Sequence, residues 1–251
     1  MIAVSSRRRL VAVGFVLALA VGACGSSSSS SNPLGGLPGG AGNAAGTGAS
    51  LISGLSSNLD QLTSYKFSWT LASTSTSAQG SPADTGSFGT SGTVINKPTQ
   101  SAQVNSLGIQ YIQIGTQEWT SFDGNSWTAS DATGSNITDL LPTKDYATWF
   151  DANSTGFKVV GEESKNGVQC IHYKGDSSLG ALYQGLSGVS ANFQADLWVA
   201  KDGNYPVSGV YGFSASAGGQ GGSFGYSFDI TNINDPSNKV TAPTNVIAVP
   251  T

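Results

Sequence analysis

The sequence predicts an α+β fold built on one large, curved antiparallel sheet. Apolar and polar residues alternate over many short segments, and glycine, asparagine and aspartate separate these segments as turns. Helical spacing of apolar residues is confined to a few places. Because such short connections join neighbouring strands as hairpins, the sheet should be antiparallel, and helices set apart from the strands define the α+β class.

The first expected element is a helix at the start of the folded part. Its apolar stripe consists of Leu51, Ile52, Leu55, Leu59 and Leu62. Ser50 is an acceptable N-cap for this helix. The period then changes abruptly, because residues 65–71 alternate between apolar and polar side chains. This change predicts a helix followed by a strand with one buried face.

About eleven strands are expected in hairpin succession. They cover residues 65–71, 88–95, 100–105, 109–114, 118–122, 126–128, 157–163, 168–174, 193–199, 207–213 and 224–230. Asp123-Gly124 and Asn166-Gly167 supply turns, and residues 218–222 are expected to form a glycine-rich loop. Since so many twisted strands seldom stay open and flat, we expect the sheet to curl into a half barrel or full barrel.

The strand pattern is interrupted twice. Residues 136–150 predict two short helical turns separated at Pro142, and residues 179–186 predict a third helical piece. With the opening helix, these pieces should cap the concave side of the sheet.

The first 50 residues predict an export signal and a tether. Three arginines, Arg7 to Arg9, precede an apolar run at 10–23, which is too short to span a bilayer but suits a signal peptide. Residues 1–23 are therefore expected to be removed on export. Residues 24–50 contain a Gly/Ser-rich, uncharged stretch with a typical end-to-end distance of about 28 Å. One folded domain is expected over residues 51–251.

The charge of the exported chain excludes one class of partner. The arginines leave with the signal, so eight lysines face fifteen acidic residues, a formal charge of −7. Nucleic-acid binding depends on basic side chains that neutralise phosphates. We therefore expect no nucleic-acid partner. The sequence leaves the oligomeric state open.

Val21-Gly22-Ala23-Cys24 resembles the bacterial lipobox, whose cysteine is diacylglycerylated and becomes the first residue. The resemblance implies that Cys24 carries acyl chains such as palmitate, which anchor the protein to the extracytoplasmic face of the cell membrane. Each buried methylene contributes about 0.8 kcal/mol, and two or three chains give stable attachment. A conventional cleavage nearby, with Cys24 incidental, is the alternative.

The order of elements resembles the LolA/LolB-like half-barrel superfamily, and within it the LppX/LprA/LprF/LprG-type bacterial lipoproteins. The resemblance is carried by the lipobox, the helix-to-strand passage at 62–67, the aromatic hairpins over 111–127, and the strand–turn–Pro-Val succession at 193–207. It covers residues 51–243. It implies a lipoprotein that binds lipid or glycolipid acyl chains in a half-barrel cavity, for carriage or presentation at the cell envelope.

An apolar ligand would lie against the concave face. The candidate binding residues are Phe67, Trp69, Leu71, Phe193, Leu197, Tyr211, Phe213, Phe224, Tyr226 and Phe228. The alternative is that the helices fill this space with Leu55, Leu59, Trp149, Phe150, Leu182 and Leu186. In that case the domain would be an envelope protein-interaction or sensing module, with Trp127 or Trp198 as exposed contact residues.

Cys170 and His172 are two residues apart on an expected strand and should share a face. With Cys24 acylated, Cys170 has no disulfide partner and is expected to be an inert, buried thiol. No third group that would orient a Cys–His pair for nucleophilic attack is evident. One histidine and one thiol also fall short of a zinc site.

Residues 151–156 with Glu162 match part of the spacing of a calcium loop. A helix end and an Asx-type turn is the preferred interpretation. Glu162, Glu163 and Asp229 are the acids that could be considered for the carboxylate pair of a glycosidase, but Glu162 and Glu163 are adjacent on a strand and must face opposite ways, so they cannot form that pair. We expect no catalytic residues, no metal and no cofactor.

Overall fold

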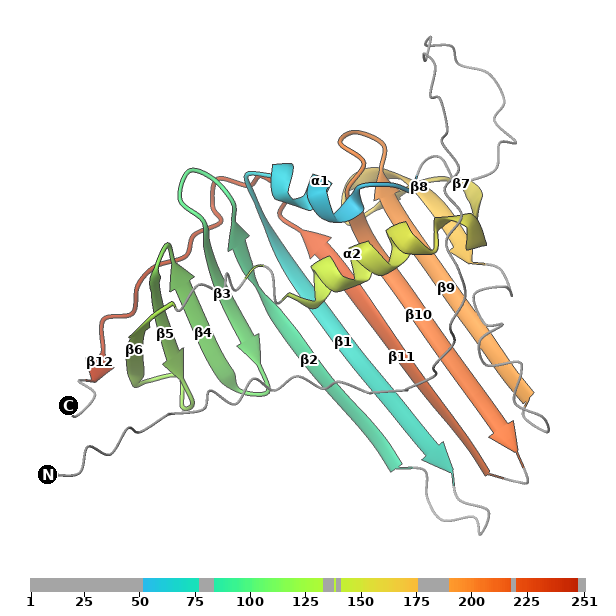
Figure 1. Ribbon diagram of the computed structural model, residues 1–251, viewed down its shortest axis with the longest axis horizontal. Helices are drawn as coiled ribbons and strands as arrows, with labels where there is room; N and C mark the ends of the chain where they lie inside the picture. The colour runs from blue at the N-terminus through green and yellow to red at the C-terminus, as the bar shows by residue number, and fades with distance from the viewer. Residues whose placement is uncertain are drawn as a thin grey trace, which may run out of the picture. The chain divides into compact units, whose positions relative to one another are not determined.

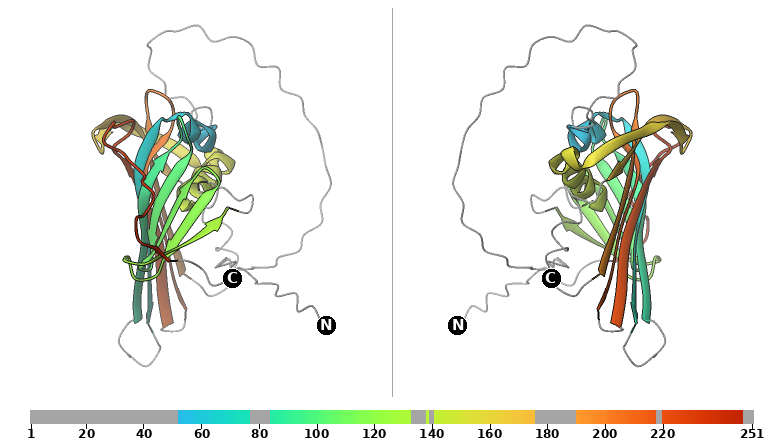
Figure 2. Two further views of the ribbon diagram at one scale, coloured as in Figure 1. Left: turned by 90° about the vertical axis from the view of Figure 1, so that its left-hand side faces the viewer. Right: turned by 90° about the vertical axis from the view of Figure 1, so that its right-hand side faces the viewer.

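The computed structural model describes residues 52–76, 84–132, 138, 141–175, 190–217 and 220–247. Over these ranges the chain forms one unclosed sheet of twelve strands, with two α-helices on one of its faces (Figure 1). The sheet curves around the side that carries the helices (Figure 2). The predicted α+β class and the large curved antiparallel sheet are confirmed.

The elements have the following bounds. The helices are α1 (Leu55–Gln61), α2 (Pro142–Ala152) and the 3-10 turn η3 (Ser154–Gly156). The strands are β1 (Ser64–Thr76), β2 (Asp84–Ile95), β3 (Ser101–Ser106), β4 (Ile109–Ile114), β5 (Gln117–Ser121), β6 (Trp127–Asp131), β7 (Phe157–Lys165), β8 (Val168–Gly175), β9 (Ser190–Ala200), β10 (Pro206–Ala217), β11 (Gln220–Thr231) and β12 (Val246–Ile247). Their order in the sheet is β12-β6-β5-β4-β3-β2-β1-β11-β10-β9-β8-β7.

Each of the eleven predicted strands is present, and β12 is an addition. β12 pairs with β6 in parallel, whereas the other neighbours are antiparallel. A strand of two residues shows no alternation, so the sequence gives no signal for it.

The central strands are longer than predicted. β1 continues to Thr76 along a serine- and threonine-rich stretch, and its partner β11 already begins at Gln220. Residues 220–222 are therefore in β11, not in the expected loop. These ends lack apolar alternation, and they are held by the backbone ladder and by polar pairs such as Thr74 and Ser223, whose hydroxyls lie 2.7 Å apart.

The opening helix is shorter than predicted. It begins at Leu55, with Gly54 as its N-cap in a left-handed conformation (φ 68°), rather than after Ser50. Ser50 and Leu51 lie outside the described residues, and Ile52 is buried but precedes the helix. A residue far along the sequence completes the cap, because the N–H of Leu55 donates to Oδ1 of Asp151 over 3.1 Å.

Pro142 begins α2 instead of interrupting a helix. Proline suits the first helical position because its missing N–H has no intrahelical partner there. Most of residues 136–140, the expected helical piece at 179–186 and the whole of 1–50 lie outside the described residues. Neither helix in the described ranges has the length and apolar character that a membrane crossing requires.

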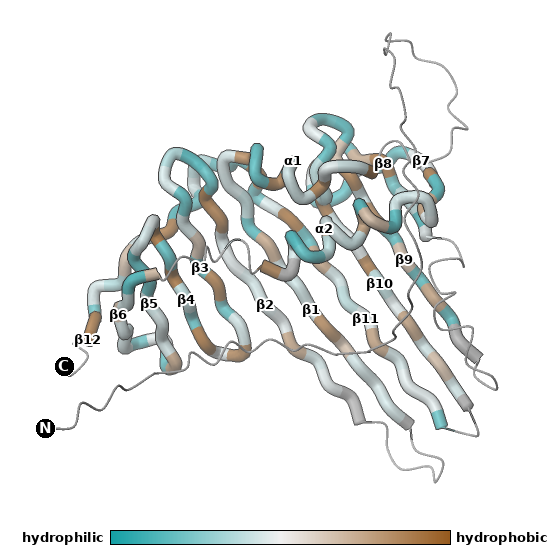
Figure 3. Tube along the Cα trace, in the orientation of Figure 1, coloured by the Kyte–Doolittle hydropathy of each residue, from teal (hydrophilic) through white to brown (hydrophobic). Residues whose placement is uncertain are grey.

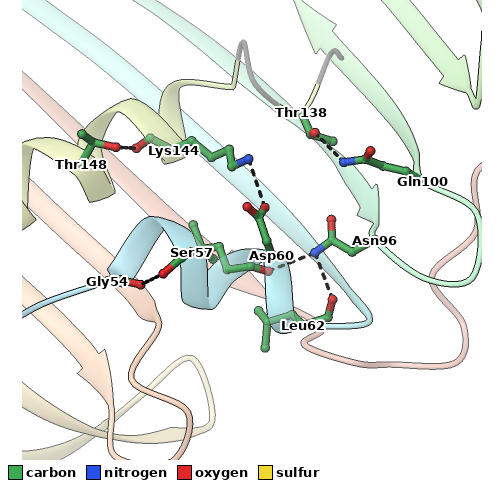
Figure 4. A network of polar contacts seen from close by, with 10 residues as sticks. Gly54, Ser57, Asp60, Leu62, Asn96, Gln100, Thr138, Lys144 and Thr148 are labelled. Carbon is green, nitrogen blue, oxygen red and sulfur yellow. Dashed lines mark hydrogen bonds and ion pairs between the residues drawn. The ribbon is translucent and has the colours of Figure 1, made fainter. Parts of the chain in front are cut away.

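Polar contacts fasten both helices above the sheet (Figure 4). The Lys144 ammonium on α2 lies 3.1 Å from the Asp60 carboxylate on α1. Asn96, which follows β2, donates from Nδ2 to the carbonyls of Leu59 and Leu62, each over 3.0 Å. The end of α1 is thus tied to the end of β2, and α2 is tied to α1.

Candidate functional site

The strand register places the predicted ligand-binding residues on one face. Residues directly opposite one another in antiparallel strands point to the same side. Three successive rows cross β1, β11, β10 and β9 in that order. They are Trp69, Phe228, Gly209 and Leu197; Leu71, Tyr226, Tyr211 and Ala195; and Ser73, Phe224, Phe213 and Phe193. Phe67 lies on the same face of β1, one pair above Trp69.

The first row is closed off by the helices. Phe67, Trp69, Leu197 and Phe228 are all buried, in one core cluster with Leu55, Leu59 and Phe150 of the two helices. The interpretation in which helices fill the concave face therefore holds for this part of the sheet.

The middle row lies under aromatic side chains of α2. Tyr146 stacks on Tyr226, with ring centroids 3.9 Å apart, and Trp149 meets Tyr211 edge-on at 5.2 Å. Burial raises the pKa of Tyr146 to about 12. Tyr211 is buried, whereas Tyr226 and Leu71 stay half-buried. The edge of α2 thus passes over this row.

The outer row continues beyond α2. Phe193, Phe213 and Phe224 are half-buried, and with Leu71 and Tyr226 they form a surface that we call the aromatic shelf. Its rings are in contact, because Phe213 lies 5.6 Å from Phe224, and Phe193 lies 4.9 Å from Tyr211. Figure 3 shows apolar residues on β1, β9, β10 and β11 continuing past α2.

The three rows contain no charged residue among their twelve positions. An uncharged surface of aromatic rings favours contact with apolar groups, because a charged group buried against it would have no partner and would be costly. The five predicted residues of the shelf and the five buried ones thus differ in role: the buried residues hold the helices, and the shelf residues leave apolar surface available.

Sequence reasoning missed two residues of this face. Phe88 on β2 lies opposite Leu71 and packs against Trp69 at 5.0 Å. Tyr146 projects from α2 onto the middle row, beside Trp149, which the alternative interpretation names for this space. The spacing of three residues between Tyr146 and Trp149 is the signal that would have found Tyr146, because residues that far apart lie on one helix face.

His172 lies in a polar cluster on the opposite face of the sheet. Its Nε2 is 2.9 Å from Oδ1 of Asp196, and its Nδ1 is 3.0 Å from Oε1 of Glu163. The ring stacks on Trp198 with centroids 4.4 Å apart. Both ring nitrogens are therefore occupied by carboxylates, in an arrangement that links β7, β8 and β9.

Cys170 is fully buried and packs with Ala200 and Val207. Burial raises the pKa of its thiol, which opposes formation of the nucleophilic thiolate. Cys170 and His172 share a face, as predicted, but each is committed to other neighbours.

Asp151 and Glu162, the acidic residues of the calcium-loop interpretation, each have a different partner. The Asp151 carboxylate accepts the Leu55 N–H, and Glu162 forms an ion pair with Lys201. In the part of the chain that the structure describes, no three metal-ligating side chains gather into a potential metal site.

The two tryptophans expected as exposed contact residues are not free surface groups. Trp127 is 7% exposed, at the start of β6 beside β12. Trp198 is half-buried, stacked on His172, and its indole N–H donates to Glu163. This part of the alternative interpretation was wrong.

No protein-family model matches the chain, and no curated protein does. Among solved structures, the lipoprotein LppX of Mycobacterium tuberculosis is 18% identical with a TM-score of 0.35, and the match covers 76% of this chain and 96% of LppX. LprF of Mycobacterium bovis is 14% identical with a TM-score of 0.39, covering 79% and 96%. A LolA superfamily protein of Nitrosomonas europaea is 13% identical with a TM-score of 0.20, covering 74% and 94%. These matches include the kinds of protein that the sequence resembles.

Proposed function

We propose that the folded domain binds the acyl chains of a lipid or glycolipid on the aromatic shelf. We further propose that acyl chains on Cys24 anchor it to the extracytoplasmic face of the cell membrane after removal of residues 1–23, and that residues 24–50 tether it there. The role is binding, for carriage or presentation of the lipid, rather than catalysis.

The aromatic shelf is the observation that supports this proposal. Phe193, Phe213 and Phe224 extend the core surface beyond the helices and stay half-buried. With strands about 4.8 Å apart, the outer row across four strands is about 14 Å wide. Each methylene of an acyl chain that leaves water on such a surface contributes about 0.8 kcal/mol.

Lipid that purifies with the protein is the direct test. The full chain is isolated from membranes in mild detergent, and its bound lipid is measured by native mass spectrometry and after extraction. We expect one or more acyl lipids per chain, in addition to the covalent acyl chains on Cys24. A protein that carries no lipid and takes up none when lipid is added would contradict the proposal.

Variants of the shelf locate the site. Phe213→Ser with Phe224→Ser should reduce the bound lipid at least tenfold, because two apolar contacts are lost where the chain would lie. Val160→Ser is the matched control, since Val160 is 58% exposed on β7, on the other side of β8 from the shelf strands. Equal loss in the control and the double variant would place the lipid elsewhere.

A further inference from the structure

The two most exposed large apolar side chains in the described residues lie on neighbouring hairpins. Phe122 is 77% exposed and Leu107 is 70% exposed. Leu107 lies in the turn between β3 and β4, and Phe122 follows β5 directly. The two hairpins are adjacent in the sheet, so their centres are separated by two strand spacings, about 10 Å.

Both turns lie at the same end of their strands and at nearly the same level, while β1, β2, β10 and β11 extend farther in that direction (Figure 1). Ser106 and Ile109 form the last pair before the first turn, and Ser121 pairs with Gln110, the next residue of β4. Because neighbouring strands alternate in direction, β1 runs toward this same end, so the outer row of the aromatic shelf also lies toward it.

The fold does not account for these two side chains. Leu107 has a φ of 53°, a left-handed conformation that favours glycine and asparagine and is unfavourable for leucine. Asparagine, which occupies the other left-handed non-glycine positions of the described chain, would relieve both the backbone strain and the exposure of an apolar side chain. The choice of leucine therefore points to a partner outside the domain.

The loop that carries Phe122 is fixed by hydrogen bonds within itself. Oδ1 of Asp123 accepts the backbone N–H groups of Asn125 and Ser126, each over 2.8 Å, and the hydroxyl of Ser121 at 3.1 Å. The one carboxylate of this loop is thus engaged, and Phe122 is held outward beside it. The sequences 105–110 and 120–126 contain no lysine or arginine, so attraction to an anionic partner has no basis here.

We propose that Leu107 and Phe122 form a bilayer-docking edge, at which the two tips enter the boundary between headgroups and acyl chains of a membrane. The inference rests on the proposed function, because the anchor on Cys24 would keep this edge near the bilayer. By themselves, two convex tips offer far too little area for a stable protein interface, which buries about 800 Å² on each partner. Single apolar side chains suit an interfacial membrane contact, whose strength follows the apolar area that it buries. Docking in this orientation also turns the outer row of the shelf toward the lipid.

Depth-dependent quenching tests the docking edge in the full, membrane-purified chain. Leu107→Cys and Phe122→Cys are each labelled with an environment-sensitive fluorophore, and Val160→Cys, on β7, serves as the matched position. Cys170 is fully buried and does not compete for the label in the folded protein. The chains are reconstituted into phosphatidylcholine vesicles with nitroxide-bearing acyl chains. We expect at least a twofold loss of fluorescence at 107 and 122, little change at 160, and the same result at low and high salt.

Labels at 107 and 122 that behave like the label at 160 would overturn the proposal, as would a chain that does not associate with the vesicles. Quenching that vanishes at high salt would indicate a charge-based contact and would also count against it. Leu107→Asn with Phe122→Ser should slow uptake of lipid from vesicles at least fivefold, while lipid supplied in detergent binds as before. If the unaltered chain binds no lipid at all, the proposed function fails, and the quenching result still decides the docking edge.

Discussion

The ring of Tyr146 on α2 lies against the ring of Tyr226 on β11, with centroids 3.9 Å apart and planes inclined by 18°. This contact marks the boundary between the part of the sheet that α2 covers and the aromatic shelf beyond it. It joins the helix to β11, one of the four strands that contribute to all three rows.

Tyr146→Ala should reduce the free energy of unfolding by about 2–3 kcal/mol. The substitution removes a half-buried ring that stacks on Tyr226 and also lies 5.9 Å from Trp69. Denaturant unfolding of the full chain measures the change. Tyr146→Phe keeps the ring and should cost less than about 1 kcal/mol. A large loss in both variants would mean that the hydroxyl, not the stacking, holds α2.

Gly209→Ala should destabilise the fold by about 1–3 kcal/mol because the position is overpacked. An added Cβ at Gly209 would lie 2.4 Å from one carbon of the Phe228 ring and 3.2 Å from the Phe150 ring. Gly161→Ala on β7 is the matched control, since no heavy atom lies within 4 Å of its Cβ position, and it should change stability by no more than about 0.5 kcal/mol. Thermal or denaturant unfolding distinguishes the two. Equal effects would show that backbone freedom rather than ring contact decides both positions.

Gly209 also shows how far the sequence predicts this fold. The alternation through 207–213 predicted a strand with Tyr211 and Phe213 on its buried face, and the structure confirms it. The pattern could not show that Gly209 provides room for Phe228, because that contact depends on the register between β10 and β11. Register is set by many pairs at once and leaves no local signal in either strand.

The sequence predicted which residues of the candidate site share one face of the sheet, but not which of them stay accessible beyond α2. Alternation placed Phe193, Phe213 and Phe224 on one side, and the register confirms that they form one row. The sequence could not tell this row from the buried row above it, because the position of α2 on the sheet depends on long-range contacts such as that of Asp151 with Leu55. For the same reason the sequence could not show that Asp151 caps α1, because Asp151 and Leu55 lie far apart in the chain.

Asp123 should titrate at a pH of about 2. The N–H groups of Ser126 and Asn125 hold the pKa of this carboxyl below its usual value of 3.8, because they stabilise the charged form. A depressed pKa in the folded state means that the stabilising effect is present above pH 3.8 and is lost as the pH falls toward 2. The carboxyl carbon shift of Asp123, followed by NMR between pH 1.5 and 6, measures this midpoint. A midpoint near 3.8 would mean that the loop carrying Phe122 does not keep these hydrogen bonds in solution.

Counting reactive thiols tests the burial of Cys170 and the acylation of Cys24 together. The chain has two cysteines. Cys170 is fully buried in the fold, and burial raises the pKa of its thiol. A thiol reagent should therefore not modify Cys170 until the protein unfolds. If Cys24 carries a thioether-linked lipid, the native chain should show no reactive thiol and the unfolded chain should show one. Cys170→Ser, which leaves the anchor unchanged, should then show none in either state. One reactive thiol in the native chain and two after unfolding would contradict the acylation of Cys24, whereas a native thiol that disappears in Cys170→Ser would contradict the burial of Cys170.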